Sequence, residues 1–345
     1  MTLNIILFAL AIPWVSYKIC TKPDTLPPTR QNVSIMFYNV ENLYDPYDDS
    51  TTLDDEFTRE GSKKYTWGKF RAKLNHLAKT VTTAGGWDTL AFIGLCEVEN
   101  RYVLNKLIYE TTIKRFGYRI IHKDSPDARG VDVAALYHPS KMKLLSFKYF
   151  RVIFPFDTTI RTRDLLYVKG LLFGCDTVHL FVNHWPSRMG GKELSDKRRN
   201  YVAGMVRGIV DSILPASNII LMGDFNDEPA DSSLRVHLGA ATAKNDTSLL
   251  FNLMGLKNLK WTEGTIRYRG SWSTFDQFVV TGTMLDGRSG LQTGPEEATI
   301  CRFPFLLQED QTWFGDKLNR TYIGPRFNGG FSDHLPVMLR IRKVE

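Results

Sequence analysis

The sequence predicts an α/β fold in which two β-sheets pack against each other and helices cover their outer faces. Three observations support this prediction. Short apolar segments bounded by turn residues recur from Val33 to the end of the chain. Segments with helical periodicity lie between them, and several apolar segments are continuous runs, as in strands buried on both faces. The 345 residues are 43% hydrophobic and 23% charged, which excludes disordered, collagen-like and polytopic membrane proteins.

The N-terminal segment differs from the rest of the chain. An apolar run from Leu3 to Val15 is too short to span a bilayer, which takes about 20 apolar residues, so we expect no stable membrane span. The run has the length of a signal-peptide hydrophobic region, but no Lys or Arg precedes it, so a hydrophobic leader is the alternative. We therefore expect an exported protein (periplasmic, cell-surface or secreted), with a cytoplasmic location as the alternative.

The expected organisation of the chain has three parts. Residues 1–20 form the signal peptide or leader, and residues 21–31, which contain Pro23, Pro27 and Pro28, form a linker. No second linker follows. Residues 32–345 are therefore expected to form a single domain.

The elements of that domain are predicted in chain order. The expected strands are the apolar segments 33–38, 89–95, 131–137, 165–173, 178–182, 219–222, 275–280 and 336–341. A helix is expected over residues 68–82, because apolar residues recur there at helical spacing. The residues that carry this pattern are Phe70, Leu74, Leu77 and Val81. Similar patterns predict helices over residues 100–116 and 195–213.

The charge balance is mildly basic. Lys and Arg total 44 and Asp and Glu total 37, which gives a net charge of +7. Such a surplus attracts anions such as nucleic acid, phosphorylated substrates or acidic lipid, and an ordinary solubility charge is the alternative interpretation. The cysteines are far apart and lack the spacing of zinc ligands, so no structural zinc site is expected. They are Cys20, Cys96, Cys175 and Cys301.

Polar residues recur where the apolar strands begin or end. One such residue would be ordinary, because strands end in loops rich in Asn and Asp. Here six sites repeat the pattern, which indicates a shared site. They are Asn39 with Glu41, Glu97 with Glu99, Asn183 with His184, Asp224 with Asn226, Asp276, and Asp333 with His334.

The residue types at these six sites narrow the chemistry. Carboxylate and amide oxygens are the ligands that Mg²⁺, Mn²⁺ or Ca²⁺ prefer, and histidines near acids supply acid–base catalysis or charge stabilisation. Together they suit hydrolysis of a phosphate ester assisted by a divalent metal. The sequence has no Gly-Lys-Ser/Thr phosphate loop and no Gly-x-Ser-x-Gly motif, which disfavours ATP binding and serine hydrolysis.

The order and spacing of these motifs resemble the endonuclease/exonuclease/phosphatase superfamily, which is deoxyribonuclease I-like. The resemblance covers residues 33–342, nearly the whole chain after the leader. It implies a four-layer α/β sandwich, with two central and mostly antiparallel sheets, and a single catalytic domain over residues 32–345. The segments that carry it are Tyr38-Asn39-Val40-Glu41-Asn42-Leu43, Leu95-Cys96-Glu97-Val98-Glu99, Val182-Asn183-His184, Gly223-Asp224-Phe225-Asn226, Phe275-Asp276-Gln277-Phe278 and Ser332-Asp333-His334-Leu335-Pro336.

The resemblance also implies a metal site, with Mg²⁺ as the expected ion and Mn²⁺ or Ca²⁺ as alternatives. Glu97 would be the main metal ligand, and Asn39 and Glu41 would line the same site. The family often has Asp or Asn at the position of Glu41, which makes its metal role less certain. Asp333 would bind the metal or support it.

The remaining motif residues would carry the reaction. By the same resemblance, Asp224 would position or deprotonate the attacking water, and Asn226 would hold the phosphate. His334 would stabilise the phosphate or transfer a proton, oriented by Asp276. His184 is similar to the second catalytic histidine of the deoxyribonuclease I branch and would also contact the phosphate.

Two further residues are candidates by position. Asp132 could be the partner of His184, and a surface turn carboxylate is the alternative interpretation. Arg188 lies in the loop after His184 and could clamp a phosphate oxygen, because a guanidinium matches phosphate bidentately. A solvated loop arginine is the alternative.

Basic and aromatic residues are mixed in three segments, residues 197–201, 261–272 and 320–327. Such mixtures can bind a phosphate backbone and stack on bases, although the first segment fits the solvated face of a helix equally well. A long aromatic-rich insert, residues 285–330, precedes the Ser-Asp-His motif. If it folds over the site, it would shape substrate choice.

The sequence thus predicts a metal-dependent phosphodiesterase, with an endonuclease-like hydrolase of nucleic acid as the leading hypothesis. The second hypothesis is a phosphatase or phosphodiesterase for a small phosphorylated metabolite or lipid headgroup. The third is a binding module without catalysis, which the complete set of acids and histidines disfavours. No protein partner is implied.

Overall fold

The computed structural model describes residues 31–213, 217–244, 248–257, 259–260 and 262–344. The predicted leader and residues 21–30 of the predicted linker lie outside these ranges. Gln31–Glu345 form one structural unit. Within the described ranges, no helix is both long enough and apolar enough to cross a membrane.

The first sheet has β1 at its centre, paired in parallel with β2 and antiparallel with β20. Its strand order is β14-β20-β1-β2-β4-β3, and β15 also pairs with β20. The strands are β1 (Asn32–Leu43), β2 (Phe92–Val98), β3 (Arg119–His122), β4 (Asp132–Tyr137), β14 (Leu291–Gln292), β15 (Ala298–Ile300) and β20 (Val337–Lys343).

The second sheet has the order β5-β6-β7-β8-β13-β10-β9. The central strands β7 and β8 are parallel, and β13 runs antiparallel to β8. The strands are β5 (Met142–Phe150), β6 (Leu165–Leu172), β7 (Asp176–His184), β8 (Asn218–Asp224), β9 (Ala240–Ala241), β10 (Leu250–Asn252) and β13 (Asp276–Thr281).

Alternation along the strands separates an inner core from two outer ones, because successive side chains point to opposite faces. On β1, Ile35 and Phe37 enter the core between the sheets, whereas Met36 faces the core under the helices. Residues of both sheets share the inner core, so the two sheets pack face to face.

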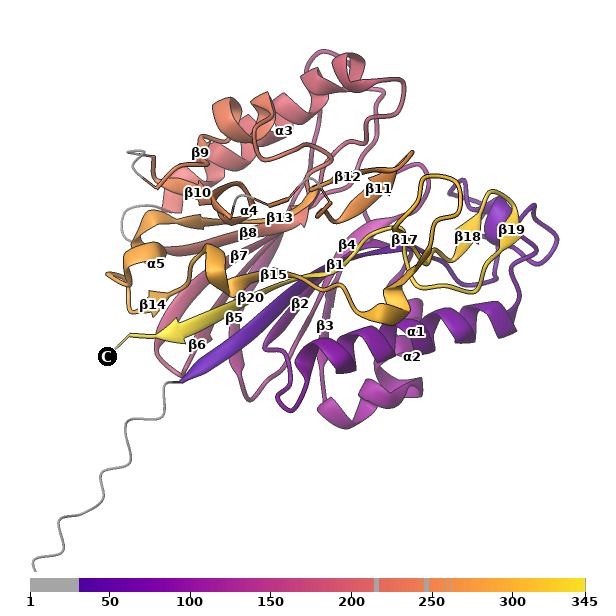
Figure 1. Ribbon diagram of the computed structural model, residues 1–345, viewed down its shortest axis with the longest axis horizontal. Helices are drawn as coiled ribbons and strands as arrows, with labels where there is room; N and C mark the ends of the chain where they lie inside the picture. The colour runs from indigo at the N-terminus through magenta and orange to yellow at the C-terminus, as the bar shows by residue number, and fades with distance from the viewer. Residues whose placement is uncertain (1–30, 214–216, 245–247, 258, 261, 345) are drawn as a thin grey trace, which may run out of the picture. The chain divides into compact units, whose positions relative to one another are not determined.

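Helices complete the outer layers. Helices α1 (Trp67–Gly85) and α2 (Arg101–Glu110) cover the first sheet, and α3 (Lys192–Ile213) covers the second. Figure 1 shows these helices on opposite sides of the packed sheets. The predicted arrangement of two sheets between helices, a four-layer sandwich, is confirmed. The short helices are η1 (Asp55–Phe57), η2 (Thr112–Phe116), η3 (Ser233–His237), η4 (Pro295–Glu297), η5 (Pro304–Leu306), α4 (Leu253–Leu256) and α5 (Gly282–Asp286).

The predicted elements agree with the structure apart from one helix and several short strands. The helix expected over residues 100–116 ends at Glu110, because Thr111 adopts an extended backbone and its side chain caps η2 instead. Strands β3, β5, β9, β10, β14 and β15 were not predicted, and neither were three short hairpins. The hairpin strands are β11 (Ile266–Tyr268), β12 (Ser271–Ser273), β16 (Leu307–Glu309), β17 (Asp316–Leu318), β18 (Tyr322–Ile323) and β19 (Arg326–Phe327).

His179 on β7 gives the fold a predictable sensitivity to acid. Its Nδ1 lies 2.7 Å from Tyr167 Oη, and burial together with the nearby Lys169 lowers its pKa to about 4. The unfolded chain, with a histidine pKa of about 6.5, binds the proton more readily between these two values. The free energy of unfolding should therefore fall by about 2 kcal/mol, after allowance for solvent screening, as the pH drops from 6.5 to 4.

The change that tests this is His179→Gln, which keeps a hydrogen-bonding group and removes the titration. Urea unfolding at pH 7 and pH 4.5 should show a smaller pH dependence in the variant than in the natural chain. Equal pH dependence in both proteins would assign the acid sensitivity to other groups.

Candidate active site

The predicted site residues meet at one edge of the sandwich because of strand direction. His184 and Asp224 end the parallel strands β7 and β8 and lie in register, and Asp276 starts the antiparallel β13 opposite Asp224. Asn39, near the end of β1, lies in register with Cys96, one residue before Glu97. The carboxyl ends of four strands and the start of a fifth therefore share this edge.

Asn39 connects the two sheets at this edge. Its Nδ2 donates to Glu97 Oε1 at 3.3 Å in its own sheet and to Asp224 Oδ2 at 3.1 Å in the other sheet. Its Oδ1 accepts from the backbone N–H of Glu41. Asn39 is fully buried, and its backbone carbonyl oxygen accepts from Ser332 Oγ at 2.7 Å. This side chain therefore fixes the separation of two carboxylates that come from different sheets.

A backbone irregularity aims Glu97 into the site. The pairing of β2 with β4 shifts between Cys96 and Val98, so Glu97 is an extra residue in its strand. Its φ is +61°, a left-handed conformation that costs a non-glycine residue about 1 kcal/mol or more. Bulges of this kind re-aim a side chain, and here the Glu97 carboxylate accepts from Asn39 and from the Asn42 N–H at 2.9 Å.

Asp276 and His334 form a buried acid–base pair. Asp276 Oδ2 lies 2.6 Å from His334 Nδ1, and the other ring nitrogen, Nε2, lies 3.8 Å from Asp224 Oδ2. The His334 backbone N–H donates to Ser332 Oγ, and the N–H of Asp276 donates to Thr265 Oγ1. Hydroxyl groups therefore hold the backbone of both residues, and His334 Nε2 points toward the carboxylate of Asp224.

The two histidines of the site have opposite electrostatic environments. Burial alone would lower the pKa of His334, but the carboxylates of Asp276 and Asp224 outweigh it and raise that pKa well above the usual value. Burial lowers the pKa of His184 well below the usual value, and Arg163 and Arg129 lower it further. At neutral pH the site therefore holds one cationic and one neutral imidazole.

Asp224 lies between these rings. Its Oδ2 is 3.6 Å from His184 Nε2, and its Oδ1 accepts from the Asn226 N–H at 3.0 Å. Burial raises its pKa to about 7; His334 opposes this shift and Asp276 adds to it. A carboxylate with a pKa near neutrality is suited to accept a proton from water.

The donor set at this edge fits a divalent cation. The Glu97 carboxylate accepts from Asn39 and from the Asn42 N–H, and among the described residues it forms no ion pair with Lys or Arg. Asp224, by contrast, has His334 at 3.8 Å. Carboxylate oxygens such as those of Glu97 are what Mg²⁺ or Mn²⁺ binds. Atoms of Asp224, Asp276 and His334 also lie within 4.8 Å of one another, but the 2.6 Å contact makes His334 a partner of Asp276, which leaves Glu97 as the better metal ligand.

Glu41 and Asp333 have partners that the sequence analysis did not anticipate. Arg320 donates from Nε to Glu41 Oε1 at 3.1 Å and from Nη2 to Asp333 Oδ2 at 2.8 Å, so its guanidinium links the two predicted metal ligands. The Thr321 N–H occupies the other oxygen of Glu41. Of the three predicted metal ligands, Glu41 and Asp333 are therefore paired with an arginine and Glu97 is not, and the metal roles of all three stay predictions.

The proposed pairing of Asp132 with His184 is wrong. Asp132 Oδ2 lies 3.0 Å from His122 Nε2 on the neighbouring strand β3, and its Oδ1 accepts from the Ser125 N–H. His184 Nδ1 has no hydrogen-bond partner among the described residues. Asp132 therefore orders the β3–β4 connection instead of orienting a catalytic histidine.

Arg188 does not present a free guanidinium to the site. It donates to Asp227 Oδ1 at 3.0 Å, to Asp231 Oδ2 at 2.7 Å and to the Asn226 carbonyl oxygen at 2.8 Å. Its Nε and Nη2 therefore hold the loop after β8, and its role as a phosphate clamp stays a prediction. Asn226 itself, with a φ of +53°, lies at the site edge and donates from Nδ2 to the Trp185 carbonyl oxygen.

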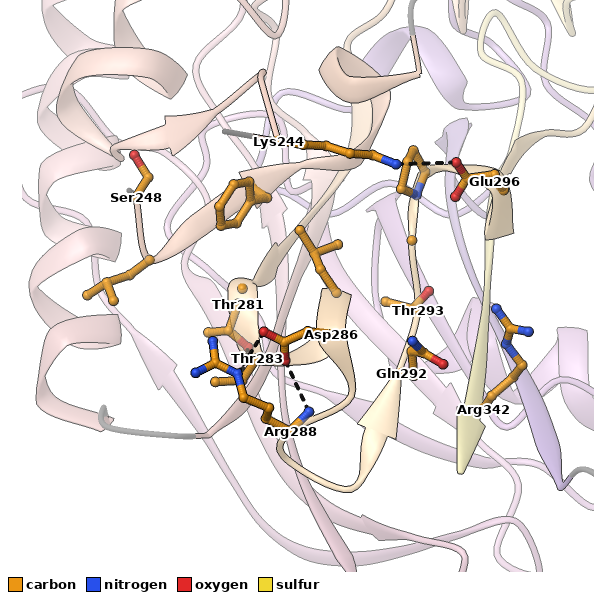
Figure 2. Close-up of a pocket in the computed structure, with 16 residues that line it drawn as sticks. Lys244, Ser248, Thr281, Thr283, Asp286, Arg288, Gln292, Thr293, Glu296 and Arg342 are labelled. Carbon is orange, nitrogen blue, oxygen red and sulfur yellow. Dashed lines mark hydrogen bonds and ion pairs between the residues drawn. The ribbon is translucent and has the colours of Figure 1, made fainter. Parts of the chain in front are cut away.

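Two cavities differ in their relation to this edge. A cavity of about 220 Å³ opens beside it and is lined by Glu41, Asn42 and Arg320 together with Lys63 and Tyr322. A cavity of about 690 Å³, drawn in Figure 2, is lined by none of the predicted site residues. Its lining includes Thr281, at the opposite end of β13 from Asp276.

Figure 2 shows two ion pairs among the charged side chains of the larger cavity, whereas Arg342 pairs with Glu297, which does not line it. Lys244 lies 3.6 Å from Glu296, and Arg288 lies 2.7 Å from Asp286. The larger space is therefore separate from the candidate active site.

Comparisons with known proteins agree with the fold described above. Among curated proteins none matches the sequence. Several solved structures are similar at low identity, which establishes the fold. The structure of D. rerio TDP2 complexed with a single-strand DNA product is 14% identical, with a TM-score of 0.55, and the match covers 90% of this chain and 98% of that one.

Two other solved structures give similar values. An endonuclease/exonuclease/phosphatase family protein from Bacteroides thetaiotaomicron is 13% identical, with a TM-score of 0.57 and coverage of 91% of this chain and 99% of that one. The human Nocturnin catalytic domain with a bound sulfate anion is 14% identical, with a TM-score of 0.54 and coverage of 91% and 96%. The sequence profile described as "Endonuclease/Exonuclease/phosphatase family" matches residues 34–343. The chain therefore belongs to the endonuclease/exonuclease/phosphatase family.

Proposed function

We propose that this chain is a divalent-metal-dependent phosphodiesterase that hydrolyses nucleic acid. The observation that carries the proposal is the convergence at one edge of the cationic His334, held by Asp276, and the carboxylate Asp224, beside Glu97. The similar D. rerio TDP2 structure contains a single-strand DNA product, which supports nucleic acid as the substrate class. The net charge of +7 also favours a polyanion.

Within this proposal each side chain has a role that its geometry supports. Asp224 accepts the proton of the attacking water, because burial brings its pKa to about 7. His334 directs Nε2 toward the same point and, as a cation, stabilises the negative charge that develops on the phosphoryl oxygens. Asn39 keeps Asp224 and Glu97 at a fixed separation. A divalent ion bound through Glu97 would supply further charge neutralisation at the phosphate.

A small phosphate ester is the second candidate substrate. The cavity of about 220 Å³ beside Glu41 and Asn42 is large enough for one small group and includes the cationic residues Lys63 and Arg320. A substrate that places a single phosphorylated group there would need no extended binding surface. A metabolite or lipid headgroup is therefore the alternative that the assay must separate from nucleic acid.

The test is hydrolysis of supercoiled plasmid, single-stranded RNA and bis-p-nitrophenyl phosphate by the full chain, each with Mg²⁺, Mn²⁺ or EDTA. We expect metal-dependent cleavage of nucleic acid that Glu97→Ala lowers by about 10²-fold or more. Mn²⁺ binding followed by electron paramagnetic resonance should weaken in the same variant. An Asp286→Asn variant, which changes an exposed carboxylate of the cavity in Figure 2, is the control.

The outcomes separate the candidates. Cleavage of the small ester with plasmid and RNA untouched would replace nucleic acid with a small substrate. Cleavage that persists in EDTA, or Mn²⁺ binding unaffected by Glu97→Ala, would contradict the proposed metal site.

A further inference from the structure

Two hairpins that lie apart in the sequence pack together in the structure, and the first of them falls in the basic and aromatic segment 261–272. The hairpin β11–β12 and the hairpin β16–β17 share a small core that also contains Phe331 and Leu335, on either side of the Ser-Asp-His motif. Ile266 and Trp272 of the first hairpin pack against Leu318 of the second within this core. The insert is therefore anchored at the catalytic edge rather than extended into solvent.

Arg267 organises the tip of the second hairpin. Its side chain is only 6% exposed; Nη1 donates to Asp310 Oδ2 at 3.0 Å, and Nη2 donates to the carbonyl oxygens of Phe314 at 2.7 Å and Trp313 at 3.3 Å. Its Nε donates to the Gly270 carbonyl oxygen in the first hairpin. One buried guanidinium thus ties both tips together and satisfies their backbone.

The aromatic rings carried by these tips face solvent. Trp313 is 54% exposed, Phe314 is 81% exposed and Tyr268 is 70% exposed. Phe314 has a φ of +54°, a conformation that a bulky residue adopts at a cost of about 1 kcal/mol or more. Large aromatic rings that hydrogen-bonded hairpin tips hold in solvent indicate a contact surface rather than core residues that failed to be buried. We call Tyr268, Trp313 and Phe314 the aromatic platform.

The platform is continuous with the candidate active site. Ile266, two residues before Tyr268, forms an isolated β-bridge with His334. The Leu335 N–H donates to the Thr265 carbonyl oxygen at 2.7 Å, one residue further along the same connection. The segment that carries Tyr268 is therefore joined directly to the segment that carries His334.

Cationic groups accompany the rings. The Arg269 guanidinium lies 5.2 Å from the centre of the Tyr268 ring, and that of Arg302 lies 4.6 Å from the Trp272 ring. Arginines beside exposed rings are typical of surfaces that bind single strands, where rings stack on bases and cations contact phosphates. Bases within a duplex already stack on one another, so rings at hairpin tips can stack only on unpaired bases.

We propose that the aromatic platform binds unpaired bases of a single-stranded nucleic acid whose phosphate lies at His334. The proposal rests on the proposed function and makes the substrate more specific: a single strand, or a duplex with an unpaired end, rather than a fully paired duplex. Rings at a tip can also enter a lipid surface, and the experiment below decides between these two partners.

The test measures the affinity of each variant for two DNA ligands, a fluorescein-labelled twelve-nucleotide oligo(dT) and a blunt duplex. All variants carry Asp224→Asn, which prevents hydrolysis. Trp313→Ala with Phe314→Ala should weaken oligo(dT) binding roughly five- to a hundredfold, the effect of losing one stacked base, and change duplex binding little. The slope of log affinity against log salt should stay constant, because no cation is removed. Trp87→Ala, a fully exposed tryptophan beyond the far end of α1, is the matched control.

Further variants report directly on the contact between the platform and the bases. As single substitutions of exposed side chains, they are also expected to leave the fold intact. Oligo(dT) should quench tryptophan fluorescence less in Trp313→Phe than in Trp87→Phe, because only the former lies at the proposed contact. Phe314→Ser alone, at the most exposed ring of the platform, should also weaken binding. Arg269→Gln should instead reduce the salt slope by about one.

The outcomes separate this proposal from the proposed function. A chain that neither binds nor cleaves any nucleic acid refutes the proposed function itself. Cleavage of nucleic acid with oligo(dT) affinity equal in the platform and Trp87 variants refutes the platform and leaves the function standing. Unchanged oligo(dT) binding together with lost sedimentation on vesicles of phosphatidylserine and phosphatidylcholine would assign the platform to a membrane surface and overturn the proposal.

Discussion

Replacing Asp224 with Asn should lower kcat for phosphodiester cleavage by about 10³-fold and change substrate affinity less than tenfold. Asp224 is the buried carboxylate whose pKa of about 7 makes it the proton acceptor, and Asn cannot accept a proton from water. The amide can still accept from the Asn226 N–H, so the local fold should persist. Single-turnover cleavage and oligonucleotide affinity measure the two effects separately.

The control for this prediction is a carboxylate of similar chemistry outside the site. Asp286→Asn removes an exposed carboxylate that pairs with Arg288 and should leave kcat within twofold. If Asp224→Asn retained more than a tenth of the activity, Asp224 would not be the proton acceptor. The role would then pass to another group at the same edge, such as neutral His184.

The meeting of these residues at one edge could be predicted because the sequence marks their positions locally. Asn39, Asp224 and His334 each stand beside an apolar strand, and the direction of those strands brings them to the same edge. The resemblance implied that Asp276 orients His334. The structure places Asp276 Oδ2 2.6 Å from His334 Nδ1, although 58 residues separate the two in the sequence. Strand-end position and motif order were therefore enough for the residues that define the chemistry.

The partners of charged residues could not be predicted in the same way. Arg320 lies 279 residues from Glu41, in an insert without long elements, and nothing in the sequence couples the two. Asp132 meets His122 because β3 and β4 form an antiparallel pair, and β3, with four residues, is too short for periodicity to show. Which side chains meet across strands depends on register, which the sequence alone did not specify.

The strands that were not predicted lack the periodic apolar pattern that marks a buried strand. β5 is an edge strand whose residues are mostly exposed, so Lys143, Ser146 and Lys148 interrupt the apolar run that marks a buried strand. The hairpin strands β11, β12, β16 and β17 have three residues each, too few for an alternating pattern. Arg267 rather than strand length stabilises their tips, and a single arginine leaves no recognisable pattern in the sequence.

Replacing Asp276 with Asn should separate the position of His334 from its charge. The amide oxygen can still accept from the His334 Nδ1–H, but the negative charge that raises the imidazole pKa is lost. Burial, which lowers that pKa, is then opposed only by the charges of Asp224 and Asp333, so the imidazolium forms at lower pH than in the natural chain. We expect kcat at pH 7.5 to fall by about 10²- to 10⁴-fold.

The pH dependence provides the decisive measurement for Asp276→Asn. In the natural chain His334 stays protonated well above pH 6.5, so activity that depends on the cation persists to alkaline pH. In the variant the alkaline limb of log(kcat/KM) should move to lower pH, toward the acid limb that Asp224, with a pKa of about 7, sets. The pH range in which the enzyme is active should therefore narrow. A ¹H–¹⁵N spectrum of the imidazole would show directly whether the pKa of His334 has dropped. A profile that merely scales down at every pH, with an unshifted limb, would mean that the charge of His334 is not what the reaction requires, and that Asp276 acts by holding the ring in place.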